Sequence, residues 1–171
     1  MISLNTKRLL LRPFLDTDLQ NLIDLDTDPE VMRYIGSGKL SSLHELQELL
    51  PKLLKRQESW ADYGTWMADL SNGENIGWFT LKPLAQLDND FEIGYRLKRK
   101  FWGQGLATEG SQFLVQYGFG PLNLKKIIGL TDPGNTGSQN VLKKSGLIYK
   151  GLIPNPFEST DGDCTLFEKI I

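Results

Sequence analysis

Residues 102–109 decide the fold, and they read Trp102-Gly103-Gln104-Gly105-Leu106-Ala107-Thr108-Glu109. Two closely spaced glycines let backbone N–H groups turn toward one point without obstruction from a Cβ atom. A helix that begins directly after them adds unpaired N–H groups and a partial positive charge. The stretch therefore predicts an anion site, of the kind that holds a pyrophosphate, at a strand-to-helix turn.

Taken alone, this turn is weak evidence for a function. It lacks the Lys-Ser/Thr pair of a P-loop, and it does not spell the G-x-G-x-x-G fingerprint of dinucleotide-binding folds. A tight structural turn is the alternative interpretation, because glycine often marks turns that bind nothing. The basic residues Lys98, Arg99 and Lys100 precede it and are candidates for a further phosphate contact.

The strands before the turn are expected from alternation and from hairpin chemistry. Residues 65–70 and 75–81 are joined by Ser71-Asn72-Gly73-Glu74, and Asn-Gly between apolar runs is a strong hairpin signal. A third strand is expected over residues 90–97. Its apolar residues alternate with polar ones, and Glu92 lies on the polar face.

Two capping boxes predict helix starts nearer the N-terminus. Thr17 and Gln20 have the required spacing, and so do Ser42 and Glu45. Pro51 lies inside the second helical pattern. We expect it to kink or divide that helix, because proline removes a backbone donor and its ring obstructs the preceding turn.

The remaining pattern completes a mixed α/β (α+β) order. The further predicted elements are strands over 9–11, 126–131, 147–153 and 165–171, and helices over 105–119 and 137–145. Antiparallel strands come early in this order, and a strand–helix–strand–helix–strand passage comes late. The length of 171 residues predicts a single domain that covers residues 1–171.

Composition excludes several kinds of chemistry. A formal net charge of -2 provides no basic excess for whole-surface nucleic-acid binding. Cys164 and His44 are the single cysteine and histidine, so no internal disulfide and no Cys/His metal site of ordinary ligand number is expected. No apolar run reaches the roughly 18 residues of a membrane helix. We expect a soluble, cytoplasmic protein with no nucleic-acid or membrane partner.

The run from Glu92-Ile93-Gly94-Tyr95 through residues 102–109 resembles the central motif of the GNAT acetyltransferases. It is most similar to the branch of the RimJ/RimL ribosomal-protein N-terminal acetyltransferases and the spermidine acetyltransferases. Four further blocks agree in order: Thr6-Lys7-Arg8-Leu9-Leu10-Leu11-Arg12, Tyr117-Gly118-Phe119, Pro133-Gly134-Asn135-Thr136-Gly137-Ser138 and Val141-Leu142-Lys143-Lys144-Ser145-Gly146-Leu147. The resemblance covers nearly the whole chain and is weaker between Gly36 and Tyr63. It implies the GNAT fold, a mixed sheet of six to seven strands flanked by about four helices.

The resemblance also implies an activity, the transfer of an acetyl group from acetyl-CoA to a primary amine by direct attack in a ternary complex. The acceptor is a protein N-terminus, a polyamine or a small amine, and no metal takes part. The implied cofactor-binding residues are Tyr95, Leu97, Lys98, Gly103, Gln104, Gly105, Leu106, Ala107, Thr108, Asn135 and Ser138. A non-catalytic acyl-CoA-binding or regulatory module on the same fold is the alternative. Monomer and homodimer both stay open.

Three residues are candidates for catalysis on this resemblance. Glu92 is the candidate base, because an amine at neutral pH is mostly protonated and must lose a proton before attack. Ser138 and Tyr149 are candidate proton donors to the thiolate leaving group. A backbone N–H near residues 95–97 is the candidate that polarises the thioester carbonyl.

Overall fold

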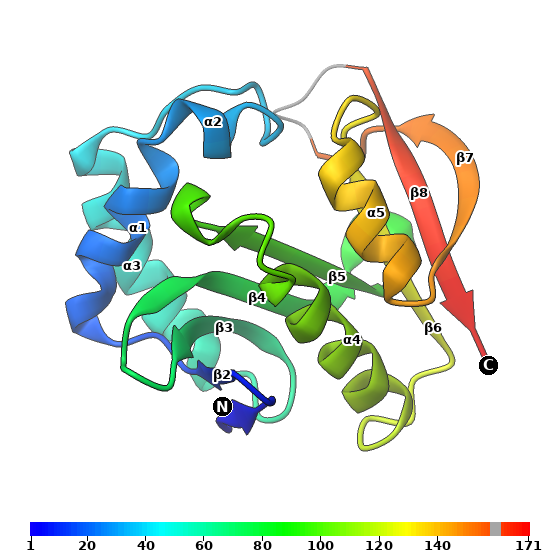
Figure 1. The fold of residues 1–171 in the computed structure, drawn as a ribbon, viewed down its shortest axis with the longest axis horizontal. Coiled ribbons are helices and arrows are strands. Elements are labelled where there is room, and N and C mark those ends of the chain that lie inside the picture. The colour runs from blue at the N-terminus through cyan, green and yellow to red at the C-terminus, as the bar shows by residue number, and fades with distance from the viewer. Residues whose placement is uncertain (158–161) are drawn as a thin grey trace.

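The computed structural model describes residues 1–157 and 162–171 (Figure 1). In these residues eight strands form one sheet: β1 Leu4–Asn5, β2 Leu9–Arg12, β3 Gly64–Leu70, β4 Asn75–Leu84, β5 Asp90–Leu97, β6 Lys126–Thr131, β7 Ile148–Pro154 and β8 Asp163–Ile170. The α-helices are α1 Leu19–Asp26, α2 Pro29–Met32, α3 Leu43–Glu58, α4 Leu106–Phe119 and α5 Thr136–Lys144. The mixed α/β prediction is confirmed. The short β1 and α2 add one strand and one helix to the expected numbers.

The sheet is antiparallel except at its middle. Its strand order is β1-β2-β3-β4-β5-β6-β8-β7, and only the β5–β6 pair is parallel. That parallel register covers two residue pairs, Phe91 with Ile127 and Glu92 with Ile128. β5 then continues to Leu97 and β6 to Thr131 without further pairing between them, so the sheet is split between the carboxyl ends of its two central strands.

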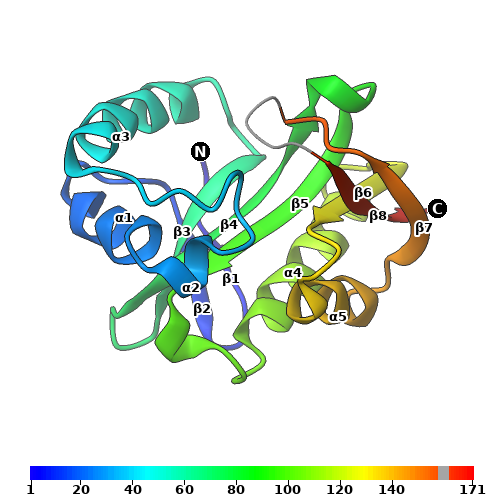
Figure 2. The same ribbon diagram turned by 90° about the horizontal axis from the view of Figure 1, so that it is seen from above.

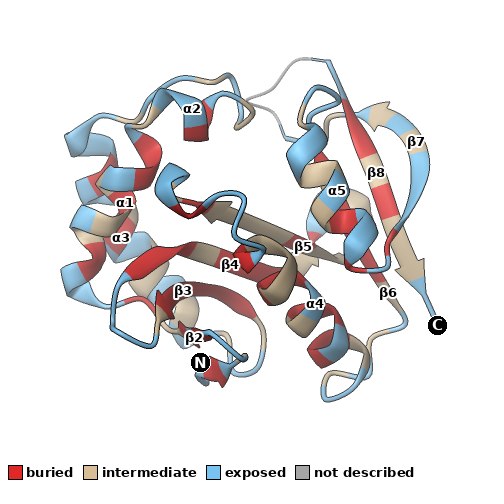
Figure 3. Ribbon diagram, viewed as in Figure 1, coloured by how far each residue is buried: buried red, intermediate tan, exposed pale blue. Residues whose placement is uncertain are grey.

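Two hydrophobic cores lie on opposite faces of the sheet (Figure 2). The larger core packs α4 and α5 against one face and includes Phe79, Leu114 and Phe167. The smaller core packs α1 and α3 against the other face through Leu22, Leu46 and Met67 among others. Figure 3 shows how β3 and β4 are buried between these layers, whereas much of β7 is exposed. Successive side chains of a strand point to opposite faces of the sheet, so β3 and β4 supply residues to both cores.

The two expected capping boxes have different outcomes. Ser42 caps α3, accepting a hydrogen bond from the Glu45 N–H (3.2 Å), while the Glu45 carboxylate accepts one from the Ser42 N–H (2.6 Å). The prediction of a capping box at Thr17 and Gln20 is wrong. Asp18 organises that start, because its carboxylate accepts a hydrogen bond from the Leu15 N–H (2.8 Å).

The proline inside the second predicted helix does not divide it. α3 runs unbroken through Pro51, from Leu43 to Glu58. The α1 segment is tied to the sheet by ion pairs, from Asp18 to Arg12 at 2.7 Å and from Asp24 to Lys98 at 2.9 Å. No helix in residues 1–157 or 162–171 has the length and apolar character needed to cross a lipid bilayer.

Gly110 allows α4 to approach the sheet closely, and this contact makes a prediction about stability. A methyl group on Gly110 would lie 2.4 Å from ring carbons of Phe79. We expect Gly110→Ala to lower the free energy of unfolding by about 1–3 kcal/mol, because an overpacked core must distort. Urea denaturation measures this change.

Gly137→Ala is the matched helical control. The nearest atom to its added methyl would be Asn135 Oδ1 at 3.6 Å, an ordinary contact. It should leave stability unchanged or raise it by up to about 1 kcal/mol, since alanine favours the helix over glycine. Equal stability of the two variants would contradict the close-packing role of Gly110.

Candidate active site

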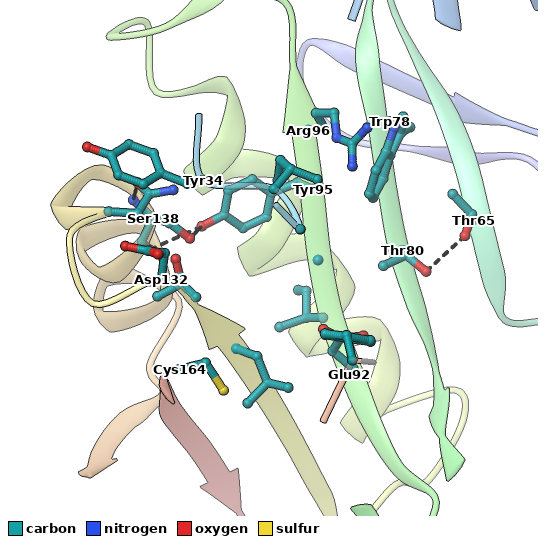
Figure 4. Close-up of a pocket in the computed structure, with 18 of the residues that line it drawn as sticks. Tyr34, Thr65, Trp78, Thr80, Glu92, Tyr95, Arg96, Asp132, Ser138 and Cys164 are labelled. Atoms are coloured by element: carbon teal, nitrogen blue, oxygen red, sulfur yellow. Dashed lines mark hydrogen bonds between the residues drawn. The ribbon is translucent and has the colours of Figure 1, made fainter. Parts of the chain in front are cut away.

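Two cavities meet at the split between β5 and β6. The first has a volume of about 550 Å³ and lies on the sheet face that α1 and α3 cover. Its lining includes Trp78, Thr80 and Glu92 from the strands, with Asp132 and Cys164 on the β6–β8 side (Figure 4). We call it the acceptor-side cavity.

The second cavity has a volume of about 520 Å³ and lies against the carboxyl end of β5, the start of α4 and the start of α5. We call it the turn-side cavity, because Gly103 and Gly105 of the glycine turn line it. The two cavities share six lining residues: Tyr34, Ile35, Tyr95, Arg96, Asn135 and Ser138. A molecule held in one cavity can therefore reach a molecule held in the other.

The glycine turn has the geometry of an anion site. Gly103 and Gly105 adopt positive φ angles of 73° and 75°, which disfavour residues with a Cβ atom. Nothing lies within 4 Å of a Cβ built on Gly103, so the space there is open. α4 begins at Leu106 without a side-chain cap, which leaves its first N–H groups available. Lys144 of α5 adds a basic residue to the lining of the same cavity.

Tyr95 bridges the split from β5 to α5. Its hydroxyl lies 2.9 Å from Ser138 Oγ and donates to the Ser138 carbonyl at 3.1 Å (Figure 4). Burial raises the pKa of the phenol to about 12, so Tyr95 stays neutral at physiological pH. Asn135 caps α5 by accepting a hydrogen bond from the Ser138 N–H (3.0 Å). The Ser138 hydroxyl is therefore not used as a helix cap.

Glu92 is a titratable group of the acceptor-side cavity that burial strongly perturbs. It lies on β5 opposite Lys82 of β4, and with Ile128 it forms the last β5–β6 pair. Burial raises the pKa of its carboxyl to about 7, against the opposing positive charge of Lys82. A carboxyl group with this pKa can accept a proton near neutral pH, as a general base must.

Comparison with known proteins identifies the family. Residues 8–148 match the family model described as "Acetyltransferase (GNAT) domain". The chain belongs to the GNAT acetyltransferase family. Members of this family are acetyl-CoA-dependent acyltransferases, so the chain is assigned to that class of enzyme.

Known proteins similar to this GNAT chain include a relative in sequence and solved structures that share its fold. The chain is 32% identical over 164 residues to FsC-acetyl coenzyme A-N(2)-transacetylase of Aspergillus fumigatus, covering 92% of this chain and 69% of that protein. The spermidine N-acetyltransferase of Vibrio cholerae, solved with CoA and spermine, has a TM-score of 0.75 at 20% identity over 95% of each chain. RimL, the ribosomal L7/L12 α-N-protein acetyltransferase, solved with coenzyme A, has a TM-score of 0.77 at 16% identity, covering 99% of this chain and 98% of that one.

The residues of this GNAT site fit acetyl-CoA as a co-substrate. The open glycine turn and the uncapped start of α4 suit the pyrophosphate. The edge of β5 beyond Glu92 has no β6 partner, and it ends at Leu97 in the turn-side cavity. Such an edge offers backbone donors and acceptors to an extended amide chain, as a missing strand would.

Most of the predicted cofactor residues are brought together, and three predicted site residues are not. The turn-side cavity is lined by Tyr95, Leu97, Gly103, Gly105, Leu106, Ala107, Thr108, Asn135 and Ser138. Lys98 lines neither cavity, because its ammonium group binds Asn21 (3.0 Å) and Asp24 (2.9 Å). The Gln104 amide donates to the Lys100 carbonyl at 2.9 Å. Tyr149 lies 50% exposed on β7, with its ring against Phe167, and it lines neither cavity.

The structure adds residues that sequence reasoning missed. Arg96 lies in both cavities, pairs with Asp26 of α1 and lies over the Trp78 ring. Its position, four residues after Glu92 on the same strand face, is a signal that alternation could have provided. Tyr34 also lines both cavities, but no local pattern in the sequence connects it with β5 or α5.

The raised pKa of Glu92 predicts a pH-dependent effect on stability. The folded-state pKa lies above the unfolded value, so ionisation of Glu92 destabilises the fold progressively as pH rises from about 4.5 to about 7. We expect Glu92→Gln to raise the free energy of unfolding by about 2–3 kcal/mol at pH 8 and by less than about 1 kcal/mol at pH 5. Urea denaturation at both pH values measures the difference.

Glu168→Gln is the control of opposite sign. Ion pairs with Lys150 (2.8 Å) and Lys126 (3.6 Å) help to lower the pKa of Glu168, despite some desolvation. Its removal should therefore destabilise the protein more at pH 8 than at pH 4. A Glu92→Gln variant that is no more stable than the wild type at pH 8 would contradict the raised pKa.

Proposed function

We propose that this chain transfers an acetyl group from acetyl-CoA to a primary amine, with acetyl-CoA in the turn-side cavity and the amine in the acceptor-side cavity. The observation that carries the proposal is the junction of the two cavities at the β5–β6 split. Glu92 lies on one side of this junction and Ser138 at its centre. A non-catalytic acyl-CoA-binding module would not require a perturbed carboxyl group in a second cavity.

Glu92 is the proposed general base. The neutral amine nitrogen attacks the thioester carbonyl carbon, and one amine proton passes to the Glu92 carboxylate directly or through a water molecule. The C–N bond forms as the C–S bond breaks. A backbone N–H on the unpaired edge of β5, near residues 95–97, is proposed to bind the carbonyl oxygen as it becomes negative.

Ser138 is the proposed hydrogen-bond donor to the departing thiolate. Its hydroxyl is free of capping, and Tyr95 holds it at the junction of the cavities. The thiolate leaves with a hydrogen bond from Ser138, and the proton that Glu92 took from the amine passes through water to the thiolate or to solvent. The products are an amide and a free thiol, Glu92 is again a carboxylate, and Ser138 keeps its hydroxyl. Tyr149 takes no part in this proposal, because it lies outside both cavities.

The acceptor is proposed to be a small amine, a polyamine or a peptide N-terminus. Asp132 and Asp163 line the acceptor-side cavity together with Glu92, and an amine that arrives protonated is favoured by negative charge. Calorimetric titration with acetyl-CoA, coenzyme A and ATP should come first, followed by thiol-release assays with one amine of each kind. Binding of acetyl-CoA and coenzyme A but not ATP, followed by thiol release with one amine, supports transfer. Binding without release from any amine favours the non-catalytic module.

The base assignment predicts a specific kinetic loss. Glu92→Gln should lower kcat by about 10²-fold at saturating acetyl-CoA, the usual worth of a general base. The wild-type rate should rise with pH through about 7, and the variant should lack this limb. Steady-state thiol release between pH 6 and 9 measures both effects.

The same Glu92 variant should bind coenzyme A with wild-type affinity, because Glu92 lines only the acceptor-side cavity. Unchanged kcat in Glu92→Gln would remove this residue from the mechanism. A large loss of coenzyme A affinity would instead mean that the two cavities are not separate in function.

If the glycine turn binds the phosphates, a substitution there should weaken coenzyme A binding by more than backbone strain alone explains. Gly103→Ala places a methyl group in the open space of the turn, and we expect it to weaken coenzyme A binding at least about 10-fold by obstructing the phosphates. Gly73→Ala is the matched control. Gly73 has a similar φ angle of 82° and equally open surroundings, but it lies in the β3–β4 hairpin.

Both alanine variants should lose about 1 kcal/mol of stability, because both force alanine into a left-handed conformation. Only Gly103→Ala should change the dissociation constant in calorimetry. Equal affinities for the two variants would place the phosphates elsewhere.

A further inference from the structure

The turn between β1 and β2 is bound to the first turn of α4 by a dense set of hydrogen bonds. The carboxylate of Glu109 accepts one from Thr6 Oγ1 (2.6 Å), one from the Arg8 N–H (2.7 Å) and one from Arg8 Nε (2.6 Å). Thr6 and Arg8 are about 100 positions from Glu109 in the sequence. None of the three residues lines the turn-side cavity, so they can act on a ligand there only through the turn.

Arg8 also contacts the glycine turn itself. Its Nη1 donates to the Gln104 carbonyl at 3.1 Å, and its Nη2 lies 3.7 Å from the position of a Cβ on Gly105. One guanidinium group therefore spans the turn from Gln104 to Glu109. Because the Gln104 carbonyl is held by Arg8, this negative end of a peptide dipole does not face the site where phosphates would bind.

Glu109 introduces a charge that would oppose phosphate binding. A carboxylate near a helix N-terminus stabilises the helix, but it also repels a second anion at the same helix end. Although desolvation alone would raise it, the pKa of Glu109 is lowered by hydrogen bonds from Thr6 and Arg8, so the group stays ionised at neutral pH. Arg8 supplies the positive charge that balances it, with 44% of the Arg8 side chain and 18% of the Glu109 side chain exposed.

We propose that Arg8 is a positioning residue for the cofactor turn, which holds the Gln104 carbonyl away from the phosphates and neutralises Glu109. The inference rests on the proposed function, in which this turn binds the pyrophosphate of acetyl-CoA. Under this proposal the segment Thr6-Lys7-Arg8, which is far from the turn in sequence, contributes to the affinity for the cofactor. Arg8 touches no reacting atom, so it should affect binding and leave the chemical step unchanged.

The test compares Arg8→Gln, Glu109→Gln and the double variant, with coenzyme A as the probe in calorimetry. Arg8→Gln should raise the dissociation constant by about 10- to 30-fold, the worth of a hydrogen bond to a charged group. The double variant should bind within about 5-fold of the wild type, because removal of the Glu109 charge relieves the repulsion that Arg8 no longer balances. For all three variants kcat at saturating acetyl-CoA should stay within about twofold of the wild type.

Lys150→Gln is the matched control for charge. Lys150 pairs with Glu168 at 2.8 Å and has 46% of its side chain exposed, close to the value for Arg8, but it lines neither cavity. Its variant removes the same unit charge and should leave the dissociation constant unchanged. An equal loss of affinity in Lys150→Gln would reduce the Arg8 effect to general electrostatics and overturn the proposal.

Two further results would overturn the inference. One is wild-type affinity in Arg8→Gln, and the other is a double variant that binds no better than Arg8→Gln alone. Failure of the proposed function would look different, because the wild-type protein itself would then not bind coenzyme A.

Discussion

The early end of hydrogen bonding between β5 and β6 is the constraint on which the site depends. Pairing stops after Glu92 and Ile128, although both strands continue. Unpaired strand edges inside a protein require other partners, since buried backbone groups are rarely left without hydrogen bonds. The split therefore leaves backbone groups on the strand edges to which an extended amide ligand can form hydrogen bonds. It also brings the two cavities into contact at one point, where a transfer reaction needs its two substrates to meet.

A split sheet would close or collapse without support on both sides, and the structure provides it. The core around Phe79 and Leu114 holds α4 against one face, and the core around Met67 holds α1 and α3 against the other. Tyr95 spans the opening through its hydrogen bonds to Ser138. These contacts support the gap from both faces and across its opening, which helps to hold the surrounding groups in place.

The two cavities are lined by different kinds of groups. The turn-side cavity presents the positive-φ glycines of the turn and the first N–H groups of α4. The acceptor-side cavity presents charged and aromatic side chains such as Trp78, Glu92 and Asp132. Structures that share this fold at 16–20% identity include enzymes for polyamines and for a ribosomal protein. One fold can thus serve different acceptors.

The sequence by itself determined the local elements, because each depends on neighbouring residues: the Asn72-Gly73 hairpin, the alternation of 90–97 and the glycine turn before α4. The same turn supported the family resemblance, which predicted nine of the residues that line the turn-side cavity. Only the tertiary structure decided which side chains reach that site. It turned Lys98 toward α1, left Tyr149 on an exposed strand, and joined residues as distant as 8 and 109. Such contacts depend on how the layers pack, and packing is not encoded in any short stretch of the chain.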